Sequence, residues 1–291
     1  MGKHPLGEVF GYPVSNYSEK AETNRNGKLC LFNNKVPQCT KSSVEDPLGV
    51  CSVLHEGKAV ITCPVRFRED WKIASDAASF FFPKTAKWTW LTEVTITDRT
   101  GAEAGNIDLV LVSIDGEENV VDFGTVEVQA VYISGNIRKV FDYYMKMGKP
   151  GFDMDWSTQK NYPRPDYLSS SRKRLAPQLI YKGGILHSWG KKQVVAVQRP
   201  FFKTLPPIPR VSRERAQVAW LIYDLDFDNA SNRYSLQLKE SVYTEFQPSL
   251  DAISKPEAGD VKDFTNTLRE KLKEKLKNYP EGSSTGDLRE Y

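Results

Sequence analysis

Residues 107–114 read Ile-Asp-Leu-Val-Leu-Val-Ser-Ile, and residues 125–131 read Thr-Val-Glu-Val-Gln-Ala-Val. Both runs are apolar, rich in β-branched residues and of strand length. Asp115-Gly116 between them is a strong hairpin-turn signal, and a third apolar run, Trp90–Thr97, precedes them. We therefore predict a three-stranded meander over residues 90–97, 107–114 and 120–133, and the rest of the fold is organised around it.

Helical patterns flank this meander. Residues 68–82 place Trp71, Ala74 and Phe81 at helical spacing before Pro83, and Ser134 is typical of an N-cap for a helix over 135–147. Downstream we predict a helix over 166–189 interrupted by Pro177, a strand over 192–197, a hairpin of 216–227 with 233–246, and a helix over 261–278. A stripe of Phe264, Leu268, Leu272 and Leu276 on that last helix indicates core contact or dimer packing. The pattern predicts an α+β fold, a mixed sheet flanked by helices.

The N-terminal quarter lacks a sustained period. We predict an irregular arm over residues 1–28 and a loop-rich segment over 30–63. Residues 1–67 would form a small region of their own and 68–291 the main domain, with a flexible tail over 280–291.

The 291 residues include 40% hydrophobic and 26% charged positions, which is typical of a soluble globular protein. No apolar run approaches the roughly 18 residues of a spanning helix, and the N-terminus does not resemble a signal peptide. Secretion and membrane insertion are not expected, and we place the protein in the cytoplasm.

The net charge of +3 is distributed unevenly along the chain, with net −7 over residues 76–133 and net +12 over 134–215. This asymmetry favours a polyanion held near a carboxylate cluster, although the charges could also mix on the folded surface.

All four cysteines, Cys30, Cys39, Cys51 and Cys63, lie in the first quarter of the chain. In a reducing compartment such a confined set favours a tetrathiolate metal site over two disulfides. No Cys-x-x-Cys pair is present, so buried unpaired cysteines remain an alternative. Thiolates accept either zinc or iron, and the sequence does not choose between them.

Carboxylates in the meander are the candidate catalytic residues. Glu127 and Gln129 are two apart on one predicted strand and so point to the same side. If Asp108 on the neighbouring strand has the same orientation, two carboxylates and an amide converge beside the Val128 carbonyl, a set of oxygen ligands that suits Mg²⁺. The alternative is that Glu127 and Gln129 face solvent on a half-exposed sheet.

This arrangement resembles the PD-(D/E)xK nuclease fold with two departures. Ile107 precedes Asp108 where proline is usual, and Gln129 stands where lysine is usual. Proline is not a ligand, so the first departure is tolerated. Glutamine can orient a water but supplies no positive charge, so the metal or a nearby Lys or Arg must do more of the work.

With the cysteines included, the chain resembles the NotI family of restriction endonucleases. The resemblance covers at least residues 11–145 and rests on Gly11-Tyr12-Pro13, Cys30, Cys39-Thr40-Lys41, Pro47-Leu48-Gly49-Val50-Cys51-Ser52, Cys63-Pro64-Val65-Arg66-Phe67 and Glu127-Val128-Gln129. It implies a structural metal, iron or zinc, on Cys30, Cys39, Cys51 and Cys63, in a region that contributes to DNA binding.

The same resemblance implies a catalytic centre of Asp108, Glu127 and Gln129 that binds Mg²⁺ through Asp108, Glu127 and the Val128 carbonyl. Glu93 on the first meander strand could add a carboxylate, although a surface role is an alternative. The resemblance also implies a homodimer acting on palindromic duplex DNA, and a methyltransferase that protects the host genome.

Basic residues after the meander could bind DNA phosphates: Arg138, Lys139, Arg164, Arg172, Lys173 and Arg174. A solvated helix face is the alternative for the last three. We expect a type II restriction endonuclease of a prokaryotic cell that hydrolyses double-stranded DNA with Mg²⁺. The rival hypotheses are a catalytically inactive DNA-binding protein and a DNA-repair nuclease without sequence specificity.

Overall fold

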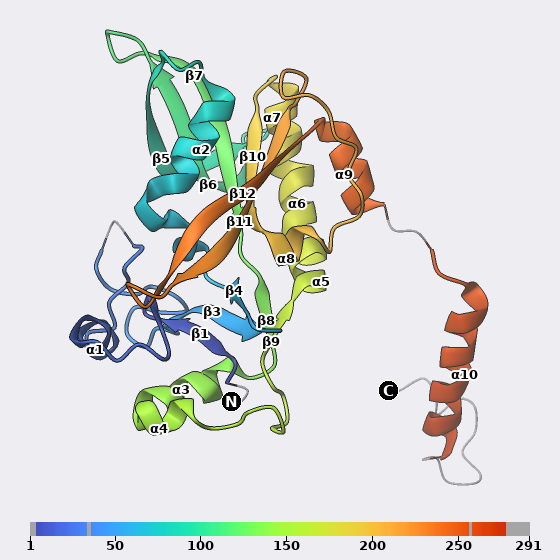
Figure 1. The fold of residues 1–291 in the computed structure, drawn as a ribbon. Coiled ribbons are helices and arrows are strands. Elements are labelled where there is room, and N and C mark those ends of the chain that lie inside the picture. Colours follow the sequence, from blue (N-terminus) through green and yellow to red (C-terminus); the bar gives the residue numbers. More distant parts are fainter. Residues whose placement is uncertain (1–3, 34–35, 256–257, 278–291) are drawn as a thin grey trace. The chain divides into compact units, whose positions relative to one another are not determined.

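The computed structural model describes residues 4–33, 36–255 and 258–277 (Figure 1). The chain divides into two compact units, residues 1–254 and residues 255–291. The first unit contains the predicted meander and the residues proposed for the site. The predicted flexible tail over 280–291 lies outside the described residues.

A mixed sheet is the centre of the first unit. Within the described residues it has six strands in the order β12-β11-β10-β7-β6-β5. The strands are β5 (Lys87–Thr97), β6 (Glu103–Ile114), β7 (Val120–Gln129), β10 (Gln193–Gln198), β11 (Val218–Asp228) and β12 (Arg233–Thr244). The β5–β6–β7 meander and the β11–β12 hairpin are antiparallel, whereas β10 runs parallel to both β7 and β11. The predicted meander, strand and hairpin are thus confirmed.

Helices cover both faces of this sheet because its inner strands are apolar on both sides (Figure 1). On β10, Val194 and Ala196 join the core under α2 (Lys72–Phe81), while Val195 and Val197 join the core on the opposite face. That opposite face is covered by a helical run made of α5 (Tyr167–Ser170), η2 (Ser171–Leu175), α6 (Ala176–Gln178), η3 (Leu179–Gly183) and α7 (Gly184–Ser188), with α8 (Arg199–Phe202) and α9 (Phe246–Ser254). The mixed sheet flanked by helices is compatible with a nuclease core.

The N-terminal region is more regular than predicted. Among the described residues, β1 (Leu6–Val9), β2 (Tyr12–Pro13), β3 (Val50–His55) and β4 (Lys58–Ile61) form a four-stranded sheet in the order β2-β1-β3-β4. A helix, α1 (Glu19–Asn26), follows β2. The prediction of an irregular arm over 1–28 was therefore wrong, and the predicted loop-rich segment over 30–63 also contains β3 and β4. These strands are short and largely buried, so they show no polar alternation that would reveal them.

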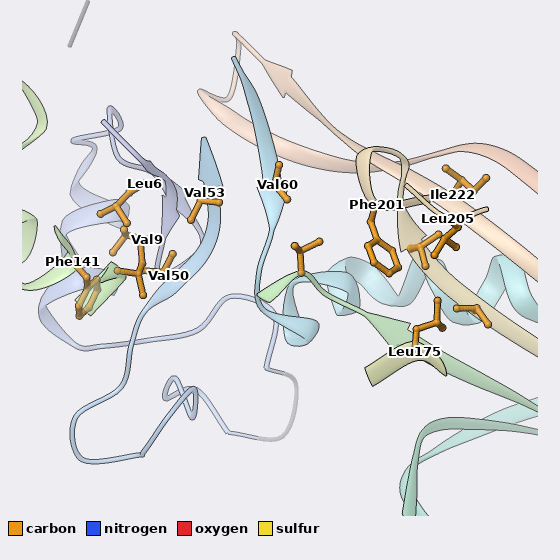
Figure 2. Close-up of a cluster of buried hydrophobic side chains, with 14 of the residues drawn as sticks. Leu6, Val9, Val50, Val53, Val60, Phe141, Leu175, Phe201, Leu205 and Ile222 are labelled. Carbon is orange, nitrogen blue, oxygen red and sulfur yellow. The ribbon is translucent and has the colours of Figure 1, made fainter. Parts of the chain in front are cut away.

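The N-terminal sheet shares its core with the central sheet. Figure 2 shows Leu6, Val9, Val50, Val53 and Val60 of the small sheet in one apolar cluster with residues from the rest of the unit, namely Phe141, Leu175, Phe201, Leu205 and Ile222. A buried glutamine adds polar contacts: Gln198 of β10 donates to the Ala59 carbonyl at 2.7 Å and accepts from the Ile61 N–H at 2.7 Å. Contacts of this kind fix the cysteine-bearing region against the central sheet.

The segment after the meander also differs from expectation. β7 ends at Gln129, and residues 132–134 form a separate strand, β8 (Tyr132–Ser134), paired with β9 (Arg164–Asp166). The helix α3 (Ile137–Met147), followed by α4 (Lys149–Phe152), is capped by Asn136, whose Oδ1 accepts from the Lys139 N–H at 3.0 Å. Ser134 is therefore not the N-cap, because Gly135, at φ = 84°, turns the chain between β8 and the cap.

The C-terminal part contains a helix that the sequence did not predict, α9, and the predicted last helix. Helix α9 follows β12 directly, where the sequence analysis extended the strand to Phe246. The predicted last helix is confirmed as α10 (Val261–Lys277), and its apolar stripe consists of Phe264, Leu268, Leu272 and Leu276. The packing of this stripe, by core contact or in a dimer, stays a prediction. Within residues 4–33, 36–255 and 258–277, no helix is both long and apolar enough to cross a membrane.

Burial of His4 predicts that the contribution of this residue to stability falls in acid. The His4 side chain is buried, its Nδ1 accepts from the Leu6 N–H at 3.2 Å, and burial lowers its pKa from 6.5 to about 4. Between these two values the unfolded chain binds a proton that the folded protein does not, so stability falls as the pH falls. His4 alone should cost on the order of 2 kcal/mol between pH 7 and pH 5. Urea titrations at both pH values compare the native protein with His4→Gln, because the raised pKa of Glu127 acts in the opposite direction in both proteins. We expect acid to lower the stability of the native protein relative to that of His4→Gln by this amount; the same pH dependence in both proteins would contradict the assignment.

Candidate active site

Asp108 lies near the middle of the meander, on β6 beside β7. Leu109 pairs with Val126, which brings Asp108 next to the end of β7. Its Oδ2 accepts a hydrogen bond from the Val128 N–H at 2.8 Å. Burial raises the pKa of Asp108, whereas the Val128 N–H and the positive charges of Lys182 and Arg174 oppose that rise. The carboxylate is thus held by the backbone of the strand that carries the second carboxylate.

Glu127 is 2% exposed and lies on β7, opposite Val195 of β10. Its pKa is raised to about 8: burial is the largest cause and the nearby Asp108 carboxylate adds to it, while the Lys182 ammonium opposes the rise. The structure therefore brings the two predicted carboxylates together. A carboxyl pKa raised by burial and by a neighbouring carboxylate is typical of a functional centre. Exposure to solvent, the alternative for Glu127, is excluded by its burial.

Gln129 is also buried, at 1% exposure, but its amide is used differently from the prediction. Its Nε2 donates to the Ala130 carbonyl at 2.8 Å, and its Oε1 has no hydrogen-bond partner within the described residues. The Val128 side chain points to the other face of the sheet, into the core under α2. Gln129 therefore contributes to the site an amide oxygen that can accept a hydrogen bond, but no charge.

Glu93 adds a third carboxylate at the edge of this pair. In β5, Thr92 pairs with Leu109 and Val94 pairs with Ile107, so the register sets Glu93 across from Asp108. Glu93 has φ = 56°, a left-handed conformation that is uncommon for a non-glycine residue in a strand. Such strain is often kept at functional sites. Its side chain is 48% exposed and pairs with the Arg68 guanidinium at 3.0 Å, and its charge raises the pKa of Asp108.

Lys182 is the residue that the sequence analysis missed. It lies on η3 and is 5% exposed, and its Nζ is 2.7 Å from the Glu127 carboxylate and 2.9 Å from the Asn106 carbonyl. The available signal was a single lysine inside the apolar stretch Leu-Ile-Tyr-Lys-Gly-Gly-Ile-Leu of residues 179–186. A charge in such a stretch is costly unless it is paired. The structure thus provides a positive charge beside the carboxylates from a different part of the chain.

The cysteines lie in two pairs of neighbouring segments. Cys30 and Cys39 flank a bridge between Leu29 and Gln38, whereas Cys51 is on β3 and Cys63 follows β4. All four thiols are free, and burial raises the pKa of Cys30 to about 11; Cys63 raises the pKa of each of the other three thiols. In the part of the chain that the structure describes, no three His, Cys, Asp or Glu side chains form a metal-binding group. The four donors suit zinc or iron chemically, but they are not arranged as a formed tetrathiolate.

The predicted DNA-binding residues are spread over several elements. Arg172, Lys173 and Arg174 all lie on η2, and Arg174 is close enough to the catalytic candidates to lower the pKa of Asp108. Arg174 also lies over the Tyr132 ring, with 5.6 Å from its guanidinium carbon to the ring centroid, and Arg164 lies 5.9 Å from the Tyr162 ring. Lys139 is exposed at the start of α3. The neighbouring Arg138 is paired with the Asp46 carboxylate at 3.2 Å.

A mixed sheet flanked by helices, with paired buried carboxylates on adjacent strands and a lysine beside them, has the composition of a nuclease site. Comparison with protein families supports this class: the family described as restriction endonuclease NotI matches residues 8–236. The chain belongs to the NotI restriction endonuclease family, and the resemblance seen in the sequence is confirmed. No curated protein matches the chain. The family match includes the cysteines, all three carboxylates and Lys182.

Proposed function

We propose that this protein is a type II restriction endonuclease that hydrolyses phosphodiester bonds of double-stranded DNA at a specific sequence, with Mg²⁺. The observation that carries the proposal is the convergence of Asp108, Glu127 and Lys182 in a chain of the NotI family. Family membership supports a nuclease that acts on DNA. The paired carboxylates on adjacent strands support the PD-(D/E)xK assignment of the core.

The residues present fit a magnesium site. Mg²⁺ is commonly bound through one or two carboxylates with several waters, and Asp108, Glu127 and the Val128 carbonyl would supply the protein ligands. When bound, Mg²⁺ would lower the pKa of a water and offset phosphate charge. Glu93 would add a further carboxylate from β5. The unoccupied Gln129 Oε1 is an acceptor that can orient a water.

In the proposed reaction, the oxygen of a water attacks the phosphorus in line with the leaving sugar oxygen. A new P–O bond forms, the bond to the leaving oxygen breaks, the water loses a proton, and the leaving oxygen gains one. Asp108 and Glu127 hold the reacting centre rigidly because the Val128 N–H and Lys182 fix their carboxylates. The positive charge of Lys182, 2.7 Å from the Glu127 carboxylate, would stabilise negative charge that develops on the reacting phosphate.

DNA would be held by Arg138, Lys139, Arg164, Arg172, Lys173 and Arg174 through its phosphates, and Arg174 is the one whose charge reaches Asp108. We propose a homodimer, since cutting both strands of a palindrome needs two such centres. A cognate methyltransferase would protect the host DNA, and the setting would be the cytoplasm of a prokaryotic cell.

We also propose that Cys30, Cys39, Cys51 and Cys63 bind one zinc or iron ion, so that residues 1–67 form a DNA-contacting region. Their neighbouring segments and donor type support this, and closing the site would require the thiols to lose protons to the metal. Elemental analysis of the purified protein should find one such ion per chain, lost in Cys51→Ser.

Digestion of several plasmid and phage DNAs tests the proposed function. We expect discrete fragments with Mg²⁺ and intact DNA with EDTA. A smear would instead indicate a nuclease without sequence specificity. Intact DNA under all conditions, with a shift of that DNA on a native gel, would indicate a DNA-binding protein without catalysis.

A further inference from the structure

Lys182 is buried, which is unusual for a lysine. Within the described residues, the buried ammonium contacts the Glu127 carboxylate and the carbonyl of Asn106, which lies two residues before Asp108. Burying an ammonium is unfavourable unless its partners compensate. Both of its partners belong to the strands that carry the catalytic carboxylates. Lys182 therefore joins the helical run to the centre of the site.

Gln129, which stands where the PD-(D/E)xK fold usually has lysine, cannot supply a positive charge to the site. Gln129 is neutral, and its side-chain NH2 group donates to the carbonyl of Ala130, the next residue in the chain. Among the described residues near the carboxylates, Arg174 acts on Asp108 without a direct contact, and Arg68 is paired with Glu93. Among the described residues, Lys182 is the cation in direct contact with Glu127. It is therefore the candidate for the positive charge that Gln129 does not supply.

The local backbone conformation positions the Lys182 side chain. Lys182 lies in η3, one of two π-helical segments that flank Pro177, which lacks the N–H that a regular helix needs. π-helical turns are frequent at functional sites. Next to Lys182, a Cβ on Gly183 would lie 2.8 Å from the Phe246 ring and 3.0 Å from Gln193 Oε1. Glycine thus lets the helical run approach α9 and β10 closely, which fixes the direction of Lys182.

We propose that Lys182 is the lysine of this catalytic centre, supplied from the helical run instead of from the strand position held by Gln129. It positions the Glu127 carboxylate and provides the positive charge that faces the reacting phosphate. This inference rests on the proposed function. It goes further in assigning the charge to a residue 55 positions away from Glu127 in the sequence.

The test moves the lysine from one position to the other. Lys182→Met removes the charge and keeps a side chain of similar length, and Lys182→Met/Gln129→Lys returns a lysine to the strand. Lys191→Met is the matched control, because Lys191 also pairs with a β7 carboxylate, Asp122 at 2.7 Å, but outside the centre. Single-turnover cleavage with Mg²⁺ is measured on a DNA that the native protein cuts, together with DNA binding in EDTA and a thermal melt.

We expect Lys182→Met to cleave at least about 100-fold more slowly with DNA binding retained, the double variant to regain at least about tenfold, and Lys191→Met to match the native protein. A single variant within about threefold of native would overturn the proposal. A slow single variant that the second substitution does not improve would indicate a purely structural role and would overturn it too.

Folding of the single variant is a separate concern, because it leaves Glu127 buried without its cation. If Lys182→Met loses its cooperative melt, the double variant decides: a folded, DNA-binding double variant that cleaves supports the proposal, and one that does not cleave overturns it. Absence of cleavage by the native protein would instead refute the proposed function itself.

Discussion

Asp108→Asn is expected to abolish DNA cleavage while the protein folds and binds DNA. Asn keeps the shape and can still accept the Val128 N–H, which is 2.8 Å from Oδ2 in the native protein. It removes one of the two buried negative charges that would hold Mg²⁺ and leaves that of Glu127. The rate should fall by at least about 10³-fold, which corresponds to about 4 kcal/mol in the activation barrier. The measurement is the initial rate of fragment formation with Mg²⁺.

Asp122→Asn is the matched control for that experiment. Asp122 is a carboxylate on the same strand as Glu127, but it is half-exposed and paired with Lys191 away from the centre. We expect its rate to stay within about twofold of native, since exposed ion pairs contribute little. An Asp108→Asn protein that still produces fragments at a rate close to that of Asp122→Asn would contradict the assignment of the centre.

Arg66→Met is expected to have the largest effect on stability. Arg66 is fully buried, and its Nε lies 3.0 Å from both carboxylate oxygens of Glu8, which is also fully buried. Its other nitrogens donate to the Glu69 carboxylate and to the Tyr234 carbonyl on β12. Removing one partner of a buried ion pair leaves the other charge uncompensated, which costs about 3–5 kcal/mol. The loss would fall on the contact between the N-terminal sheet and the central sheet.

Urea unfolding at neutral pH measures this loss, with Arg210→Met as the control. Arg210 pairs with Glu240 at 3.0 Å on the surface, and both side chains are substantially exposed, so its removal should cost less than about 1 kcal/mol. Adding Glu8→Gln to Arg66→Met should restore part of the lost stability, because it removes a buried charge. Equal losses for Arg66→Met and Arg210→Met would contradict the role of the buried network.

Much of the central sheet could be predicted because its pattern is local. The meander strands are apolar runs separated by turn signals, and α2 shows helical spacing up to Pro83. The N-terminal strands could not be predicted in the same way. Val50–His55 and Lys58–Ile61 are short and buried between other elements, so tertiary packing decides their structure.

In the candidate site, too, some features follow from local sequence patterns and others depend on tertiary packing. The pairing of Asp108 with Glu127 follows from strand order and side-chain alternation, and both properties can be inferred from sequence. Lys182 depends on how a distant helical run crosses the sheet, which no local pattern encodes. α10 shows a further limit of local patterns, because its regular apolar stripe, with Phe264 and Leu268, predicts the helix but leaves core contact and dimer packing both open. A periodic pattern predicts the helix but does not identify its partner.

Sequencing the ends of cleaved DNA is the most direct test of the central claim, that Asp108, Glu127 and Lys182 form a magnesium-dependent, sequence-specific nuclease centre. A phage DNA of known sequence is digested with Mg²⁺ by the native protein, with Asp108→Asn as the blank, and every new end is mapped. We predict that all ends fall at one short palindromic sequence, cut in both strands, and that the blank gives none. Ends scattered over unrelated sequences, or the same ends from Asp108→Asn, would contradict the account.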